Sequence, residues 1–396
     1  MNNSGSEVVI SRKITVPCPV KLERFRRNPD LGPGVLFFSG GSALKGVSEE
    51  ITEYTHNSIH IMTSFDSGGS SAEIRKAFRM LSVGDIRARL ISLADRSFRG
   101  NPEIYALFSH RLSKDSEAQV LKNQLHQLSR GTHPLMKKIQ QPLKDIISTH
   151  FDYFLKNMPT EFNLRGASLG NLILTGGFLN NNRKIEPVIY LFSRLVEVRG
   201  NVCAVTDSDY QLAAICEDGE IIVGQHEITG KEVAPLGKKI SRVFISGHPS
   251  LAKEIEIKAS SRALSLISQA ELVVYSFGSF YSSLIANILP DGISQAISEN
   301  SCPKVYIPNT TEDPELYGVD PVESALILLE YLKKNGIRTA DVLNTVFVDR
   351  KYTPTKKYIS HLKKEGVNVV SVNLTGDNTS GFFSPSRVTQ LLLSLC

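Results

Sequence analysis

The sequence predicts an α/β protein with a Rossmann-like, doubly wound and mostly parallel sheet. Two apolar runs, at residues 34–38 and 58–63, are too continuous for strands with one exposed face. Each run ends in a glycine-rich turn that leads into a helical pattern. The same alternation of strand and helix returns between residues 261 and 372. Successive βα units of this kind form parallel sheets with helices on both faces.

Composition bounds the class of protein. The chain has 396 residues, of which 41% are apolar and 21% charged, so a large core is expected and global disorder is not. The net charge of +5 is mild, and the aromatic residues are not interleaved with basic runs. We therefore expect no nucleic-acid partner. Five scattered cysteines without a CxxC pair predict neither a zinc site nor disulfides, and they fit a reducing cytosol.

The domain organisation follows from where the βα rhythm breaks. Residues 1–33 form an N-terminal extension with a polar start, and residues 34–396 form a single Rossmann-like domain. A helical excursion at 103–160 would act as a lid or a dimer surface, so a homodimer is expected. A β-rich insertion is expected at 201–246. Since no apolar run approaches the ~18 residues of a membrane span, we expect a cytoplasmic protein without a membrane partner.

The elements can be assigned in chain order from apolar periodicity and turn residues. Strands are expected at 34–38, 58–63, 201–206, 211–216, 220–226, 242–246, 271–276, 303–309, 345–349 and 367–372. Helices are expected at 47–54, 72–81, 261–270, 284–289 and 322–333, with further helices in the excursion. Ser70 or Ser71 would cap the helix at 72–81, Gly84 would end it, and Asp85 would cap the next helix.

The first βα turn contains Gly40, Gly41, Ser42 and Lys45. Its spacing matches neither the GxGxxG dinucleotide fingerprint nor the GxxxxGK[ST] P-loop. A phosphate site and an ordinary tight turn therefore both remain open for this segment.

The second βα turn, at residues 66–71, is the strongest signal in the chain. Glycines allow the backbone to approach a ligand closely, and a helix N-terminus attracts anions. Asp66 ends the preceding strand within reach of the same ligand. The glycines and hydroxyl residues that would surround a phosphate are Gly68, Gly69, Ser70 and Ser71.

Two polar residues occupy helix positions that usually disfavour them. Arg87 lies in the first turn of a helix, where the dipole disfavours a cation, so it is a candidate phosphate partner. A salt bridge to Asp66 or Asp85 is the alternative. Asn171 lies on an otherwise apolar helix face and, if buried, should be hydrogen-bonded.

Two later βα turns carry the same small and polar residue types. Residues 277–283 include Gly278, Ser279 and Tyr281, and the strand at 303–309 ends in Asn309. Because the carboxyl ends of parallel strands share one edge of the sheet, these turns should converge on one site. Their convergence predicts a nucleotide or phosphate-ester site.

Six ordered motifs resemble those of the superfamily of 2-phospho-L-lactate transferase and the gluconeogenesis-factor-like nucleotide-binding proteins. They cover most of the chain, from about residue 34 to residue 375. In family form and then in this sequence they are GGTGL or GGTGxxK at 40–45 (GGSALK), DDGGSSGxLR at 66–75 (DSGGSSAEIR), PGDIRN at 83–88 (VGDIRA), HSxGNLIL at 167–174 (ASLGNLIL), GPGSLYTSIxPNLL at 276–289 (SFGSFYSSLIANIL) and PKVYVCN at 303–309 (PKVYIPN).

The resemblance implies a Rossmann-like fold with a nucleotide, a nucleotide sugar or a phosphate diester at these loops. One branch of the superfamily transfers a phospholactyl group from a guanosine diphosphate carrier to a deazaflavin, with Mg²⁺. The other branch binds a nucleotide sugar or dinucleotide and has a regulatory role. The departures from the family pattern include Ala43, Ser67 in place of a second aspartate, Ala167 and the 276–278 segment.

These observations favour a transferase of phosphate-linked groups. Asp66 would bind Mg²⁺ or the acceptor, and Arg87 would stabilise the charge that develops on the phosphate. No tightly bound organic cofactor is expected. The alternatives are a sensor that binds the same ligand without turnover, because only Asp66 remains of the family's aspartate pair, and an α/β scaffold whose partner is another protein.

Overall fold

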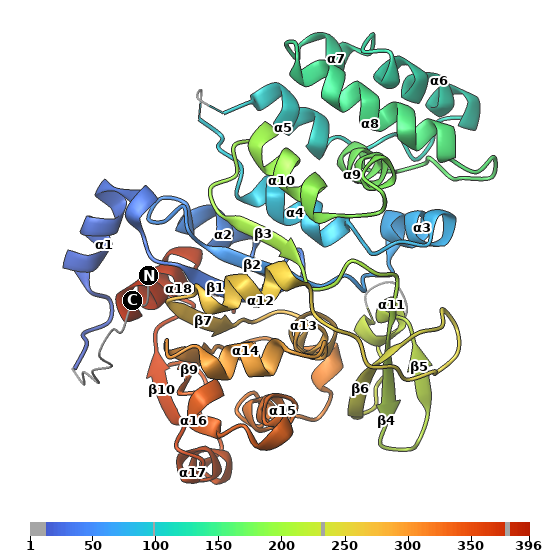
Figure 1. The fold of residues 1–396 in the computed structure, drawn as a ribbon. Helices are drawn as coiled ribbons and strands as arrows, with labels where there is room; N and C mark the ends of the chain where they lie inside the picture. The colour runs from blue at the N-terminus through green and yellow to red at the C-terminus, as the bar shows by residue number, and fades with distance from the viewer. Residues whose placement is uncertain (1–12, 98–99, 231–233, 377–380) are drawn as a thin grey trace, which may run out of the picture.

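A seven-stranded sheet forms the centre of the computed structural model, which describes residues 13–97, 100–230, 234–376 and 381–396 (Figure 1). The strand order is β10-β9-β8-β7-β1-β2-β3, and every neighbouring pair is parallel. The predicted α/β class with a parallel sheet is confirmed. The strands are β1 (Val35–Ser39), β2 (Ile59–Met62), β3 (Asn201–Ala204), β7 (Leu272–Tyr275), β8 (Lys304–Tyr306), β9 (Thr345–Asp349) and β10 (Asn368–Val372).

Strand β1 shows how both faces of the sheet are covered. Val35 and Phe37 pack with the core formed by α2 and α18, whereas Leu36 and Phe38 pack with the core formed by helices α12 to α16 on the opposite face. All four side chains are fully buried, as the two-residue period of a strand between two helical layers requires. These helices are α2 (Lys45–Ile51), α12 (Ser261–Ser268), α13 (Ala286–Ile288), α14 (Ile293–Glu299), α15 (Glu323–Leu332), α16 (Thr339–Val342) and α18 (Pro385–Leu395).

A third core lies in the helical layer beside β2 and β3 (Figure 1). Within it, α8 and α9 pack closely because α9 carries a glycine pair. A Cβ built on Gly176 would lie 1.8 Å from the His150 carbonyl oxygen, so only glycine fits there. The helices are α3 (Gly69–Phe78), α4 (Gly84–Ser92), α5 (Pro102–Ser109), α6 (Ala118–Ser129), α7 (Pro134–Lys137), α8 (Leu143–Asn157), α9 (Leu169–Asn180) and α10 (Glu186–Leu195).

A small antiparallel sheet interrupts the βα rhythm, with strand order β5-β4-β6. The predicted β-rich insertion is thus present, but its first expected strand is not part of it, because β3 pairs in parallel with β2 in the main sheet. The expected strand at 220–226 is also shorter, and His226 lies in a helix. The elements are β4 (Gln211–Cys216), β5 (Ile221–Val223), α11 (Gln225–Thr229) and β6 (Ile240–Ser246).

Several predicted helix ends are wrong. Helix α3 begins earlier, with Gly68 as its N-cap and no side-chain cap, so Ser70 and Ser71 lie inside its first turn. It ends at Phe78 because Arg79 adopts the left-handed conformation. Gly84 is therefore the first residue of α4 rather than the end of α3.

Asp85 consequently lies in the first turn of α4 and is not its N-cap, which is Val83. The helix expected at 284–289 is a π-helix over Phe280–Ile285 followed by α13. Within the described ranges, no helix is long and apolar enough to cross a membrane.

The described part of the N-terminal extension is tied to the C-terminus. Helix α1 (Pro19–Arg27) packs against α18 (Figure 1). The Cys18 amide donates to Ser394 Oγ at 2.8 Å, and Lys21 Nζ donates to the carbonyl of Cys396 at 2.8 Å. Residues 1–12 lie outside the described ranges. A basic helix α17 (Lys356–Lys364) lies between β9 and β10 in the chain.

We predict that Gly176→Ala lowers the free energy of unfolding by about 1–3 kcal/mol, because the methyl group would overlap a backbone carbonyl that cannot move aside. Denaturant titration would measure this. Asn180→Ala, at the end of the same helix and only partly buried, is the control and should change stability by less than about 0.5 kcal/mol. Equal stability of the two variants would contradict the close packing of α8 on α9.

Candidate functional site

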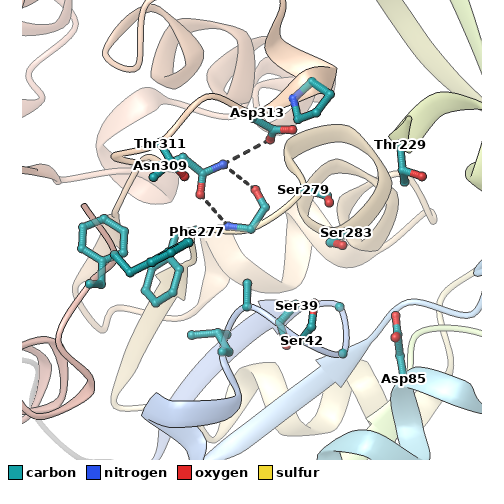
Figure 2. A pocket seen from close by; sticks show the side chains of 18 of the residues that line it. Ser39, Ser42, Asp85, Thr229, Phe277, Ser279, Ser283, Asn309, Thr311 and Asp313 are labelled. Carbon is teal, nitrogen blue, oxygen red and sulfur yellow. Dashed lines mark hydrogen bonds between the residues drawn. The ribbon is translucent and has the colours of Figure 1, made fainter. Parts of the chain in front are cut away.

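The order in which the chain adds strands to the sheet reverses between β1 and β7. From β1 the chain adds β2 and β3 on one side, and from β7 it adds β8 to β10 on the other. Ligands of doubly wound sheets bind outside the carboxyl ends of the strands at such a switch point. A cavity of about 400 Å³ lies there, lined by the loops that follow β1 and β7; we call it the switch-point cavity. Figure 2 shows residues of both loops around it.

A second cavity of about 480 Å³ adjoins the first and is lined by the N-terminal turns of α3 and α4; we call it the Arg87 cavity. Residues from the β1 loop, the β2 loop and α4 line both cavities and form a shared wall. These residues are Gly41, Ser42, Asp66, Gly68 and Asp85. The first two predicted phosphate turns therefore meet at one place.

The two glycines of the β1 loop allow this wall to form. A Cβ on Gly40 would lie 2.5 Å from Ser283 Oγ, and a Cβ on Gly41 would lie 2.4 Å from Asp85 Oδ1. Larger residues would push the β1 loop away from the π-helix and from α4. Close approach, rather than an unusual φ, is thus the reason for glycine at these two positions.

A buried cation also holds the β1 loop in place. Arg89 of α4 is fully buried and donates to the carbonyls of Gly40, at 2.9 Å, and Leu44, at 3.2 Å. It also contacts the hydroxyls of Ser39 and Ser48. Burial lowers its pKa to about 10, while the charge of Asp85 raises it. Arg89 was not predicted as a site residue, because its carbonyl and hydroxyl partners lie 41 to 50 positions away in the chain.

The second turn positions a carboxylate beside the start of α3. Asp66 Oδ1 accepts the Gly68 amide at 3.1 Å, and its other oxygen accepts the Ser82 hydroxyl at 3.4 Å. Buried Arg75 fixes the turn by donating to the Phe65 carbonyl at 2.9 Å and to the Asp66 carbonyl at 3.2 Å. Gly69, Ser70 and Ser71 line the Arg87 cavity.

Arg87 and Asn171 form a hydrogen-bonded chain in the Arg87 cavity. Arg87 Nε donates to Asn171 Oδ1 at 2.9 Å, and Asn171 Nδ2 donates to Ser70 Oγ at 3.0 Å. Asn171 is buried, so the expected hydrogen bonding is confirmed. Burial and, to a smaller extent, the charge of nearby Arg111 lower the pKa of Arg87 to about 10, against the opposing effect of Asp85. Lys45 and Arg111 line the same cavity.

The third and fourth turns are held together by side chains. Asn309 Oδ1 accepts the Gly278 amide at 2.8 Å, and Asn309 Nδ2 donates to the Gly278 carbonyl at 2.7 Å and to Asp313 (Figure 2). Asp313 accepts the Phe280 amide at 2.9 Å. Glu315 accepts the Tyr281 amide at 2.7 Å. The backbone amides of Gly278, Phe280 and Tyr281 are therefore bound to side chains of the loop after β8.

Tyr281 is the predicted site residue that lines neither cavity. Its side chain is buried, and its hydroxyl lies 3.4 Å from the Ile240 carbonyl. Glu315 is also buried, and burial together with the charge of Asp313 raises its pKa to about 7. Gly278, Ser279 and Asn309 do line the switch-point cavity.

Several cavity residues were not predicted from the sequence. Phe277, Phe382 and Phe383 form an aromatic end of the switch-point cavity, with the Phe277 and Phe383 rings 4.5 Å apart. Gln225, His226 and Thr229 of α11 reach it from the small sheet, and His226 Nδ1 lies 2.8 Å from Ser67 Oγ. Arg111 enters the Arg87 cavity from beyond α5. Only the GFFSP segment at 381–385 carried a local signal, because its glycine and proline mark a loop and loops often carry binding residues.

The charges of the two cavities differ. The described lining of the switch-point cavity contains four acidic residues and neither lysine nor arginine: Asp66, Asp85, Glu312 and Asp313. The Arg87 cavity adds three cations, Lys45, Arg87 and Arg111. Among the residues described, no cluster of three or more histidine, cysteine, aspartate or glutamate side chains is arranged to hold a metal ion.

Comparison with known proteins places these motifs in a family. The sequence profile of 2-phospho-L-lactate transferase CofD matches residues 35–382. The chain is 26% identical over 355 residues to a protein of Thermoanaerobacterium thermosulfurigenes named putative gluconeogenesis factor, covering 86% of this chain and 89% of that one. It is also 26% identical to the gluconeogenesis factor of Listeria innocua, covering 80% and 79% of the two chains.

A solved structure has the same fold. It is the crystal structure of a member of the UPF0052 family from Bacillus halodurans, which aligns with a TM-score of 0.66 over 91% of this chain and 99% of that one. The two sequences are 23% identical.

We predict that Arg89→Met loosens the β1 loop, because the Gly40 and Leu44 carbonyls would lose their buried donor, at a cost of about 1–3 kcal/mol. Hydrogen exchange of the amides at 40–48 should become about tenfold faster or more. Arg96→Met is the matched control, since Arg96 is exposed, contacts the Glu49 carboxylate and the Tyr105 ring instead of the Gly40 and Leu44 carbonyls, and should leave this exchange unchanged. Unchanged exchange in Arg89→Met would contradict the assigned role.

Proposed function

The chain belongs to the 2-phospho-L-lactate transferase CofD family, as its six motifs indicated, and we propose that it binds a nucleotide or related phosphate ester in the switch-point cavity and transfers a phosphate-linked group from this carrier to an acceptor. The observation that carries the proposal is the shared wall, where the β1 loop, the β2 loop and α4 meet between an aromatic and a cationic cavity. The parts of a nucleotide follow the same order as these cavities, because its base suits the aromatic end and its charged phosphates suit the cationic side.

In this proposal the base packs against the aromatic pair Phe277 and Phe383, because aromatic rings stack on any base. The sugar would extend past Ser279 and Asn309. The phosphates would lie at the shared wall beside the glycines of the first two turns, where the backbone permits close approach. Catalysis of phosphate transfer depends mainly on positioning and on charge stabilisation, which Arg87 would supply.

Mg²⁺ fits the side chains of the shared wall. Asp66 and Asp85 both line it, and Mg²⁺ is commonly held by one or two carboxylates together with substrate phosphates. The lining of the switch-point cavity is acidic and contains neither lysine nor arginine, so without a bound cation it would repel a diphosphate. When bound, the ion would neutralise charge on the phosphates. Asp66 and Asp85 are therefore the residues that we expect to hold it.

A second candidate function is a nucleotide sensor without turnover. Ser67 replaces the family's second aspartate, and a neutral hydroxyl offers no charge to a metal ion. This hydroxyl lies 2.8 Å from Nδ1 of the His226 ring. Relatives of the chain carry the name gluconeogenesis factor. A regulator of this kind would bind the nucleotide in the same cavities but would not transfer a group from it.

We predict that a nucleotide raises the melting temperature of the protein in a screen of GDP, UDP-sugars and NAD(P), each with and without Mg²⁺. A ligand at 100 times its Kd stabilises the folded state by about 2.7 kcal/mol. A shift that requires Mg²⁺ is expected for the transferase, and a shift independent of Mg²⁺ for the sensor. The absence of a shift with every compound would rule out both functions.

We predict that Asp66→Asn abolishes nucleotide release from the donor and leaves nucleotide affinity within a few fold, because Asp85 would still hold Mg²⁺ beside the phosphates. The amide removes the charge that a metal or acceptor needs but keeps the shape of the turn. Calorimetry gives the affinity, and Asp115→Asn, an exposed position outside both cavities, is the control. If affinity falls with turnover, Asp66 is a binding residue and its catalytic assignment is wrong.

A further inference from the structure

The Arg87 cavity has a charge distribution of its own. The two carboxylates that line it, Asp66 and Asp85, lie on the wall shared with the switch-point cavity, whereas its three cations line the Arg87 cavity alone. Positive charge is thus concentrated on the side away from the nucleotide cavity. A ligand that spans both cavities would meet the carboxylates first and the arginines beyond them.

Arg87 is held in place but its charge is not matched by a bonded carboxylate. Within the described part of the chain, its hydrogen bond runs from Nε to the neutral amide of Asn171, which leaves the terminal nitrogens of the guanidinium unbonded. Gly170 makes room for this arrangement, because a Cβ there would lie 2.7 Å from Arg87 Cδ. The chain therefore fixes the guanidinium and keeps its donor groups available.

Arg111 brings a second guanidinium to the same cavity. One of its terminal nitrogens donates to the Gly166 carbonyl at 3.2 Å, and this bond ties it to the segment that precedes α9. The two arginines are close enough for the charge of Arg111 to lower the pKa of Arg87. Two like charges held together in a partly buried cavity repel each other, and an anion between them would relieve this repulsion.

We propose that Arg87 and Arg111 bind a phosphate group of the substrate that lies beyond the first phosphate of the nucleotide, in the Arg87 cavity. This inference builds on the proposed function and assigns the distal end of its ligand. Guanidinium groups bind phosphate through paired, charge-assisted hydrogen bonds. Donors reach the cavity from α4, from the residue-111 segment and from the Ser70 turn of α3, and a tetrahedral oxyanion can accept from three such directions.

Calorimetric titration with inorganic phosphate, with a nucleoside monophosphate and with the corresponding diphosphate tests the assignment. We expect Arg111→Gln to weaken the binding of inorganic phosphate and of the diphosphate by tenfold or more and to change monophosphate affinity by less than about twofold. Arg111→Lys should recover only part of the loss, because an amine cannot form the paired contact. Arg165→Gln, an exposed arginine bonded to the Ser116 carbonyl, is the control and should bind like the wild type.

The outcomes separate this inference from the proposed function. Unchanged phosphate and diphosphate affinity in Arg111→Gln would overturn the distal site. A parallel loss of monophosphate affinity would overturn it too, because Arg111 would then bind the first phosphate. If the wild type binds inorganic phosphate through Arg111 but binds no nucleotide, the anion site stands and the proposed nucleotide function fails. Because Arg111 is exposed, the fold should tolerate these substitutions.

Discussion

The buried cation Arg89 supports the loop on which the geometry of the site depends. Its guanidinium is held by the carbonyls of Gly40 and Leu44 and by two hydroxyls, and Asp85 favours its charged form. A buried charge is tolerated only where such partners offset its loss of hydration. Because Arg89 and Asp85 belong to the same helix, one rigid element both supports the β1 loop and presents a carboxylate to the cavity. The shared wall between the two cavities follows from this arrangement.

The sequence allowed the sheet and the β1 and β2 turns to be predicted because their signals are local. Continuous apolar runs such as that of β1 indicate strands covered on both faces, and glycines at the strand ends mark close backbone approach. The connection between parallel strands then determines that the turns share an edge. Asn171 could be identified in the same way, as a polar residue on an apolar helix face.

The remaining features depend on contacts between distant segments. Nothing near Tyr281 reveals that Glu315, 34 positions later, accepts its amide and that the ring turns into the core. The amides of that turn serve to fix the loop after β8, and this stiffens one side of the switch-point cavity. Arg111 and His226 likewise reach the cavities from the helical layer and from the small sheet. Helix boundaries shifted for a local reason, since the left-handed Arg79 ends α3 before Gly84 is reached.

The central claim is that a nucleotide spans the two cavities, with its base at the aromatic end and its phosphates at the shared wall. A crystal structure of the full chain grown with GDP and Mg²⁺ would test this most directly. The account predicts electron density for the base beside Phe277 and Phe383, for the first phosphate beside Asp66 and Asp85, and for the second phosphate toward Arg87 and Arg111. Density for the nucleotide at any other place, with both cavities empty, would contradict it.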